Sequence, residues 1–197
     1  RPDILIVTDD IYEHILWGQD RFINIVNACP GLYDQTVVVN GVSKAYSMTG
    51  WRIGYVGGPE SIIKGMKKIQ SQSTSNASSM AQAAAVAALD GDQTYIKEST
   101  GIFKERHDFV LKSLQDIDGI NCLASEGTFY SFPDMNGLIE KLDGISNDIE
   151  LAEFFLEKAE VAMVPGSAFG APGCMRISFA TSMENLEKSM ERIKAAL

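Results

Sequence analysis

The sequence has few of the residues that build disulfide frameworks and metal centres. Its three cysteines, Cys29, Cys122 and Cys174, are odd in number, far apart and free of any CxxC spacing, and only two histidines, His14 and His107, accompany them. This pattern suggests neither a disulfide framework nor a zinc site, and it best fits a reducing, cytosolic compartment. We interpret both histidines as surface or helix residues rather than catalysts.

The chain also lacks an excess of positive charge and a long hydrophobic run. A net charge of -9 and a pI near 4.7 argue against nucleic acid or an anionic membrane as the main partner, because either would favour a basic face. No apolar run approaches the length of a membrane span, and no signal peptide with a basic start opens the chain. A nucleotide-binding domain is disfavoured, because neither a GxGxxG nor a Walker sequence is present.

What is there predicts an α/β fold. With 197 residues, 45% of them hydrophobic, the chain can bury a substantial core. Short β-branched runs alternate with helical or loop segments in the first half, which is typical of a mixed sheet covered by helices. The predicted elements are buried strands over residues 4–8 and 36–40, a third strand over 53–56, and helices over 60–70 and 81–89 around a polar loop.

The second half predicts a smaller α+β unit. A long helix is expected over residues 95–115, because apolar residues such as Phe103, Val110 and Leu114 share one face. Thr181 and Glu184 predict a capping box at the start of a last helix. Between these lie predicted strands over residues 120–123, 128–132, 161–164 and 175–179 and a helix over 149–159. A boundary in or near the long helix gives two domains, residues 1–100 and 101–197.

Lys44 is the most informative residue. It stands in the run NGVSKAYSMTGWRIG, directly after the predicted strand over residues 36–40, and Arg52 follows it eight positions later. A lysine at the end of a strand has its amine aimed into a cleft, where a Schiff-base lysine belongs. The whole run resembles the cofactor-attachment segment of the class I aminotransferases, which are fold type I enzymes that use pyridoxal 5'-phosphate.

The resemblance implies roles for five residues. Lys44 would hold the cofactor as a Schiff base and then act as the general base. Asp9, in the run VTDDIY, would pair with the pyridine nitrogen, and Tyr12, three positions on, would face the ring oxygen. Arg52 would bind the phosphate through its planar fork, and Arg176, in the run CMRISFA, would grip the substrate α-carboxylate.

The residues alone leave other roles open. Asp9 and Asp10 could cap a following helix, and Arg52 could form a surface ion pair. Arg176 could pair with a buried acid, although a lone arginine among apolar strand residues favours function, because burying it unpaired costs several kcal/mol. Gly41 departs from the resembled pattern, since many members place a serine there that bonds to the phosphate.

The likeness covers essentially all 197 residues and is strongest to the bacterial-type aspartate aminotransferases. It implies amino transfer between an amino acid such as aspartate and a 2-oxo acid such as 2-oxoglutarate, in a cytoplasmic homodimer with the polar loop at its interface. Residues 1–100 would be the C-terminal part of a large cofactor-binding domain, and residues 101–197 a small C-terminal domain. We expect the chain to be the C-terminal part of a longer protein and to turn over little by itself. An aromatic aminotransferase, a carbon-sulfur lyase and a catalytically inert truncated module remain alternatives.

Overall fold

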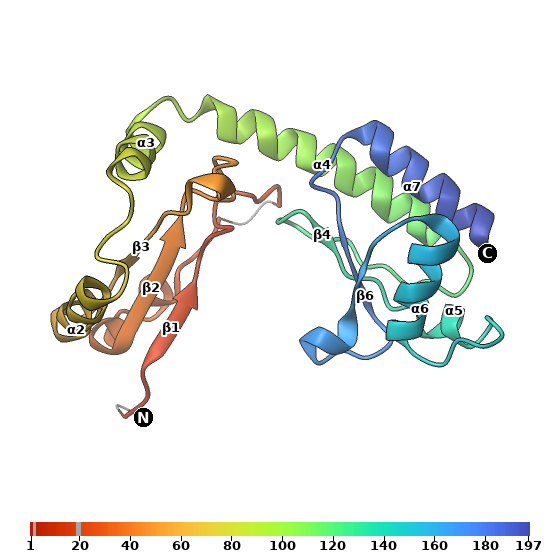
Figure 1. Cartoon of the computed structure of the whole chain (residues 1–197), viewed down its shortest axis with the longest axis horizontal. Coiled ribbons are helices and arrows are strands. Elements are labelled where there is room, and N and C mark those ends of the chain that lie inside the picture. Colours follow the sequence, from red (N-terminus) through yellow and green to blue (C-terminus); the bar gives the residue numbers. More distant parts are fainter. Residues whose placement is uncertain (2, 19–20) are drawn as a thin grey trace. The chain divides into compact units, whose positions relative to one another are not determined.

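The computed structural model describes residues 1, 3–18 and 21–197, and the chain divides into two compact units, Arg1–Thr100 and Gly101–Leu197. Each unit has its own three-stranded sheet (Figure 1). The fold class predicted from the sequence, a mixed sheet with helices followed by a smaller α+β unit, is confirmed.

The sheet of the first unit has the strand order β1-β2-β3 (Figure 1). Its strands are β1 (Ile6–Asp9), β2 (Thr36–Gly41) and β3 (Gly54–Gly57). The pair β1 and β2 is parallel, with Asp9 opposite Val39, and the pair β2 and β3 is antiparallel, with Gly41 opposite Gly54. The ends of β1 and β2 and the beginning of β3 therefore lie at the same edge of the sheet.

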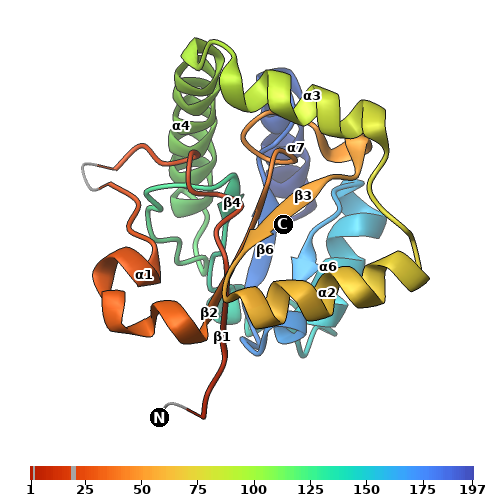
Figure 2. The same cartoon turned by 90° about the vertical axis from the view of Figure 1, so that its left-hand side faces the viewer.

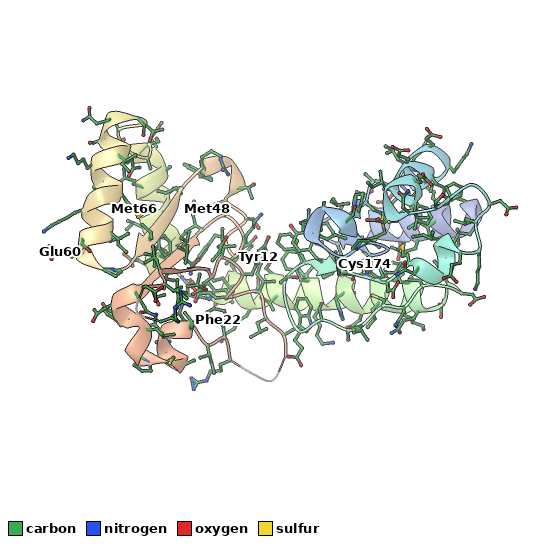
Figure 3. All side chains as sticks on the ribbon, turned by 90° about the horizontal axis from the view of Figure 1, so that it is seen from below. Tyr12, Phe22, Met48, Glu60, Met66 and Cys174 are labelled. Carbon is green, nitrogen blue, oxygen red and sulfur yellow. The ribbon has the colours of Figure 1, made fainter. Side chains whose placement is uncertain are left out.

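Helices cover both faces of this sheet. Figure 2 shows α1 (Ile25–Ala28) on one side and α2 (Glu60–Gln72) on the other. Neighbouring residues of β2 face opposite ways: Val38 lines a 230 Å³ cavity with Val26 of α1, and Val39 lines a 520 Å³ cavity with Met66 of α2. Figure 3 shows Met66 on α2, with Glu60 at the beginning of that helix.

Three further helical segments complete the first unit. They are the 3-10 helices η1 (Pro30–Gln35) and η2 (Thr49–Trp51) and the helix α3 (Ser79–Asp90). Gly91 ends α3 as predicted, with its backbone N–H donating to the carbonyl of Ala87. The next helix, α4 (Thr94–Gln115), begins in the first unit and continues into the second, and it confirms the long helix predicted over residues 95–115.

The second unit is built on an antiparallel sheet of order β4-β6-β5. Its other elements are β4 (Tyr130–Ser131), α5 (Asn136–Ile139), α6 (Asp148–Phe154), the π-helix η3 (Phe155–Ala159), β5 (Val164–Pro165), the 3-10 helix η4 (Gly166–Phe169), β6 (Met175–Ser178) and α7 (Met183–Ala196). The core joins Leu114 of α4, Phe155 of η3, Met175 of β6 and Ile193 of α7, each at most 1% exposed.

Some local predictions were wrong. The strand predicted over residues 4–8 begins at Ile6 and is not buried: Val7 is 64% exposed, because its face of the sheet is left largely uncovered at β1 by the described residues. Residues 120–123 form no strand, and only an isolated bridge joins Asn121 to Asp134. The cap of α7 is Ser182, whose Oγ accepts the backbone N–H of Asn185 at 3.2 Å. The helix starts one residue later than a Thr181 cap requires, so the predicted capping box does not form.

The sparse residues noted in the sequence have ordinary surroundings. His14 is exposed, whereas His107 lies buried in α4, and the backbone N–H of Ser125 donates to its Nε2 at 3.0 Å. The cysteines are free thiols. Among the described residues, no group of three or more His, Cys, Asp and Glu side chains is arranged to hold a metal ion. None of the described helices is both long and apolar enough to cross a membrane.

Candidate active site

Four of the five predicted site residues gather at one edge of the first unit's sheet. Asp9 is the last residue of β1, and Tyr12 lies in the turn that follows it (Figure 3). Lys44 lies in the turn after β2, and Arg52 closes the short 3-10 helix η2 just before β3. Because these strand ends share an edge, residues far apart in the sequence come into one neighbourhood.

Lys44 lies beside Tyr12. Its Nζ is 5.7 Å from the centroid of the Tyr12 ring, and the lysine side chain is half-buried. The residues around it fix the backbone, since Val42 is 0% and Ala45 is 3% exposed. The lysine therefore projects from an anchored turn, which limits the positions that its amine can take.

The neighbouring residues Asp9 and Asp10 differ in burial and in hydrogen bonding. Asp10 is 6% exposed, and its carboxylate accepts hydrogen bonds from the hydroxyl of Thr8 at 2.5 Å and from the side-chain amide of Asn24. Asp9 is exposed, and its Oδ1 accepts the backbone N–H of Ile11 at 3.3 Å. Asp10 thus holds the polypeptide together, whereas Asp9 presents its carboxylate at the sheet edge. This difference supports the choice of Asp9 for the ring nitrogen.

Sequence reasoning missed a hydrogen bond between Asn40 and Glu13, near Lys44. The side-chain amide of Asn40 donates to Oε1 of Glu13 at 2.6 Å, and its oxygen accepts the backbone N–H of Gly41 at 2.7 Å. These bonds join the turn that carries Tyr12 to the segment that leads to Lys44. The only signal in the sequence was the position of Asn40 at the end of an apolar run, where polar side chains of a site gather.

Two tyrosines near Glu13 have raised pKa values. Burial, followed by the charge of Glu13, raises the pKa of Tyr46 above its ordinary value, and the same two causes raise the pKa of Tyr55. Both phenols therefore stay protonated at neutral pH. The hydroxyl of Tyr46 donates to the side-chain oxygen of Gln93 at 2.7 Å, which fastens the lysine turn to the start of α4.

The segment after Lys44 carries backbone strain. Ser47 and Arg52 have φ angles of 54° and 51°, in the left-handed region that non-glycine residues rarely adopt. Each such residue costs roughly 1–3 kcal/mol, and such residues cluster at functional sites. The guanidinium of Arg52 donates to the carbonyl of Thr49 at 2.9 Å, and the side chain is exposed.

Gly41 lies where two backbone segments approach closely. A Cβ there would be 3.3 Å from both the Cα of Gly54 and the carbonyl oxygen of Ile53, which is tighter than ordinary van der Waals contact. The glycine lets β2 and β3 approach each other at the edge that carries the site. The departure from the serine of many resembled enzymes therefore has a packing reason in this chain.

Arg176 belongs to the second unit, in the middle of its sheet on β6. Its guanidinium carbon lies 4.7 Å from the ring centroid of Tyr130 and 4.6 Å from that of Phe169. Within the described part of the chain, no Asp or Glu forms an ion pair with it, so the structural pair with a buried acid does not occur.

Comparisons with known proteins agree with these motifs. The family model for aminotransferase class I and II matches residues 1–193. An aspartate/prephenate aminotransferase from Nitrosomonas europaea is 57% identical over an alignment of 201 positions, which covers 100% of this chain and 51% of that protein. An aspartate aminotransferase from Rhizobium meliloti is 48% identical over an alignment of 199 positions, which covers 99% of this chain and 48% of that protein.

Solved structures show the same relationship. The crystal structure of the aspartate aminotransferase from Rhizobium meliloti has a TM-score of 0.94 at 47% identity, over 99% of this chain and 50% of that one. An aromatic aminotransferase from Pyrococcus horikoshii has a TM-score of 0.89 at 34% identity, over 99% and 51%. The chain spans about half the length of the curated relatives it matches. With a family match over residues 1–193 and a shared fold, the chain belongs to the class I and II aminotransferases, as its motifs predict.

Proposed function

We propose that this chain forms part of a pyridoxal-phosphate-dependent aminotransferase in which Lys44 is the residue that holds the cofactor. The observation that carries the proposal is the approach of the Lys44 amine to the Tyr12 ring, at the sheet edge that also bears Asp9 and Arg52. An amine, a phenol, a carboxylate and a guanidinium are the groups that this cofactor requires. The chemistry of the donor set therefore fits pyridoxal phosphate.

Each residue of this set has a separate task. When bound, the cofactor supplies a ring that withdraws electrons from the substrate's α-carbon. Asp9 keeps the ring nitrogen protonated, and the hydroxyl of Tyr12 donates to the ring oxygen. Arg52 binds the phosphate through two N–H groups, which suit an oxyanion better than the single point charge of a lysine.

Lys44 would have a second task. When its amine is free, it would accept the proton from the substrate's α-carbon as a general base, and the resulting ammonium would be the acid that gives the proton back. Arg176 binds the substrate carboxylate next to that carbon. The proposed reaction moves the amino group of aspartate to 2-oxoglutarate, because the relatives named above are aspartate and aspartate/prephenate aminotransferases.

The proposal includes the placement of the domains and the partner. The unit Arg1–Thr100 is the C-terminal part of a large cofactor-binding domain, and Gly101–Leu197 is a small domain. A cytoplasmic homodimer is proposed, with the polar run over residues 70–76, at the end of α2, at its interface. Exposed apolar side chains flank that run, with Ile69 72% and Met80 75% exposed, and exposed apolar surface is typical of a contact face.

Borohydride trapping tests the role of Lys44. The full protein that carries this chain is incubated with pyridoxal phosphate, reduced and digested, and the modified lysine is identified by mass spectrometry. A pyridoxyl group on Lys44 is expected, and it should be absent in Lys44→Arg. Lys64, which pairs with Glu60 on α2 at 2.7 Å, gives a matched control as Lys64→Arg. Modification spread over surface lysines with Lys44 unmodified would disprove the assignment.

The rival functions separate in a substrate comparison. Glutamate formation from aspartate supports the proposed reaction, faster formation from phenylalanine indicates an aromatic aminotransferase, and pyruvate release from cystathionine indicates a carbon-sulfur lyase. The chain by itself is expected to have little turnover, because it covers only 51% of the length of its Nitrosomonas europaea relative. A dimer that never takes up cofactor would support the inert module.

A further inference from the structure

Aromatic rings gather around Arg176 on the surface of the second unit. Besides Tyr130 and Phe169, which both contact the guanidinium, Phe132 packs edge-on against Phe169 with ring centroids 6.1 Å apart. Phe132 and Phe169 are 43% and 49% exposed, so they add little to the core. Phe169 contacts both the guanidinium and Phe132, an arrangement suited to holding a cation in place.

The loop that brings Phe169 to Arg176 is firmly anchored. Phe169 is the last residue of η4, whose first residue, Gly166, donates its N–H to the carbonyl of Cys174 at 2.7 Å. Gly166 also accepts the N–H of Ala171 at 3.0 Å. A Cβ on Gly166 would be 2.3 Å from the carbonyl oxygen of Ala171, so the loop closes on itself too tightly for any side chain there.

A third anchor is the carboxylate of Asp148, at the beginning of α6. Asp148 is 2% exposed, and its Oδ2 accepts the backbone N–H of Ser167 at 2.7 Å. Burial acts to raise the pKa of Asp148, but hydrogen bonds from the N–H and hydroxyl of Ser167 and from the N–H of Gly173 outweigh it and hold the pKa below its ordinary value. The carboxylate is thus charged at neutral pH and directed at the loop of Phe169.

We propose that Asp148 is a positioning residue for Arg176. Through Ser167 it fixes the loop of η4, and this fixes Phe169, which together with Tyr130 holds the guanidinium. The rings restrict the arginine but offer no carboxylate that would compete for its N–H groups. The guanidinium is therefore ordered before a substrate carboxylate arrives, which lowers the entropy lost on binding. This inference rests on the proposed function, in which Arg176 binds that carboxylate.

Steady-state kinetics of the full protein with bound cofactor test the inference. The two informative variants are Asp148→Asn, which removes the charge, and Phe169→Leu, which removes the ring. Each has a matched control. Glu150→Gln removes another carboxylate of the same helix turn, one that accepts the N–H of Ser146 at 2.7 Å and not that of Ser167. Phe169→Tyr keeps the ring.

A loss of positioning should weaken substrate binding without slowing the chemical step. The expected result for Asp148→Asn and Phe169→Leu is a rise of about 2- to 30-fold in KM for both aspartate and 2-oxoglutarate, the range of one cation–π contact. The kcat and the absorbance of bound cofactor should stay close to wild type, as should every constant of Glu150→Gln and Phe169→Tyr. A merely structural role would lower the melting temperature or the cofactor content without this split between KM and kcat.

Two outcomes are decisive. If Phe169→Leu, a change of an exposed side chain, leaves both KM values at wild type, the inference is overturned even where Asp148→Asn fails to fold. The same holds if Glu150→Gln raises KM as much as Asp148→Asn does. Arg176→Lys separates this failure from that of the proposed function: if it also leaves KM unchanged, Arg176 does not bind the substrate carboxylate and the proposed function itself is wrong in that part.

Discussion

The hydrogen bonds of Asn40 predict how fast the backbone amide of Gly41 exchanges its hydrogen. Asn40→Ala removes the donor to the Glu13 carboxylate at 2.6 Å and leaves the N–H of buried Gly41 without its 2.7 Å acceptor. An unsatisfied buried donor costs about 1–3 kcal/mol. The Gly41 amide should therefore exchange its hydrogen about 5- to 150-fold faster in Asn40→Ala, since 1.4 kcal/mol corresponds to about a factor of ten.

Hydrogen exchange measured peptide by peptide checks this value and where the effect lies. Exchange should rise over the segment that leads from Gly41 to Lys44 and in the turn of Tyr12, whereas the second unit keeps its wild-type pattern. Asn27→Ala, an exposed asparagine on α1, is the control and should change neither segment. Unchanged exchange at Gly41 in Asn40→Ala would show that the hydrogen bonds of Asn40 do not hold the turn of Lys44 in place, which would refute this prediction.

Three other predictions concern stability and thiol reactivity. Gly166→Ala should destabilise the protein by about 1–3 kcal/mol, because the added Cβ would be 2.3 Å from a carbonyl oxygen. Gly65→Ala, in open space on α2, should stabilise the protein by about 0.5–1 kcal/mol. Urea denaturation measures both changes, and equal effects would contradict the packing argument. The pKa of Asp148 is lowered in the folded state, so the stabilisation by its carboxylate is present above about pH 4 and is lost as the pH falls through the folded pKa. The difference in unfolding free energy between wild type and Asp148→Asn should therefore shrink in acid, and a difference that stays constant with pH would refute this. Iodoacetamide should modify exposed Cys29 before buried Cys122, whose pKa is raised by burial. Peptide mass spectrometry measures the order of modification, and earlier modification of Cys122 would contradict the prediction.

The sequence predicted which helices form better than it predicted the bounds and burial of the strands. The helical period placed α4 and α7, because long amphipathic patterns are strong signals. The strand at residues 120–123 failed because a short apolar run does not reveal whether a partner strand exists, and here a single bridge to Asp134 replaces a ladder. The burial of Val7 was also wrong, since burial depends on what covers a strand, and a local pattern carries no such information.

The site shows the same division between what is local and what is not. Lys44 and Arg52 could be singled out because they share one continuous run of sequence. The contacts that place them could not, because Glu13 and Asn40 are separated by 27 positions and meet only when β1 and β2 pair in register. Asp148 could not be singled out for a similar reason: acidic residues are common in the first turn of a helix, and its contact with Ser167 depends on tertiary packing.

The strain around Lys44 has a physical consequence for how the site is held. Ser47 and Arg52 occupy left-handed conformations that together cost roughly 2–6 kcal/mol, so the turn between them persists only because other contacts compensate. In this structure those contacts are the buried side chains of Val42 and Ala45, the bond from Tyr46 to Gln93, and the bond from the Arg52 guanidinium to Thr49. The last of these uses one N–H of the guanidinium that we propose binds phosphate. Because a bound phosphate would draw on the same fork, cofactor binding and the conformation of this turn are expected to be coupled.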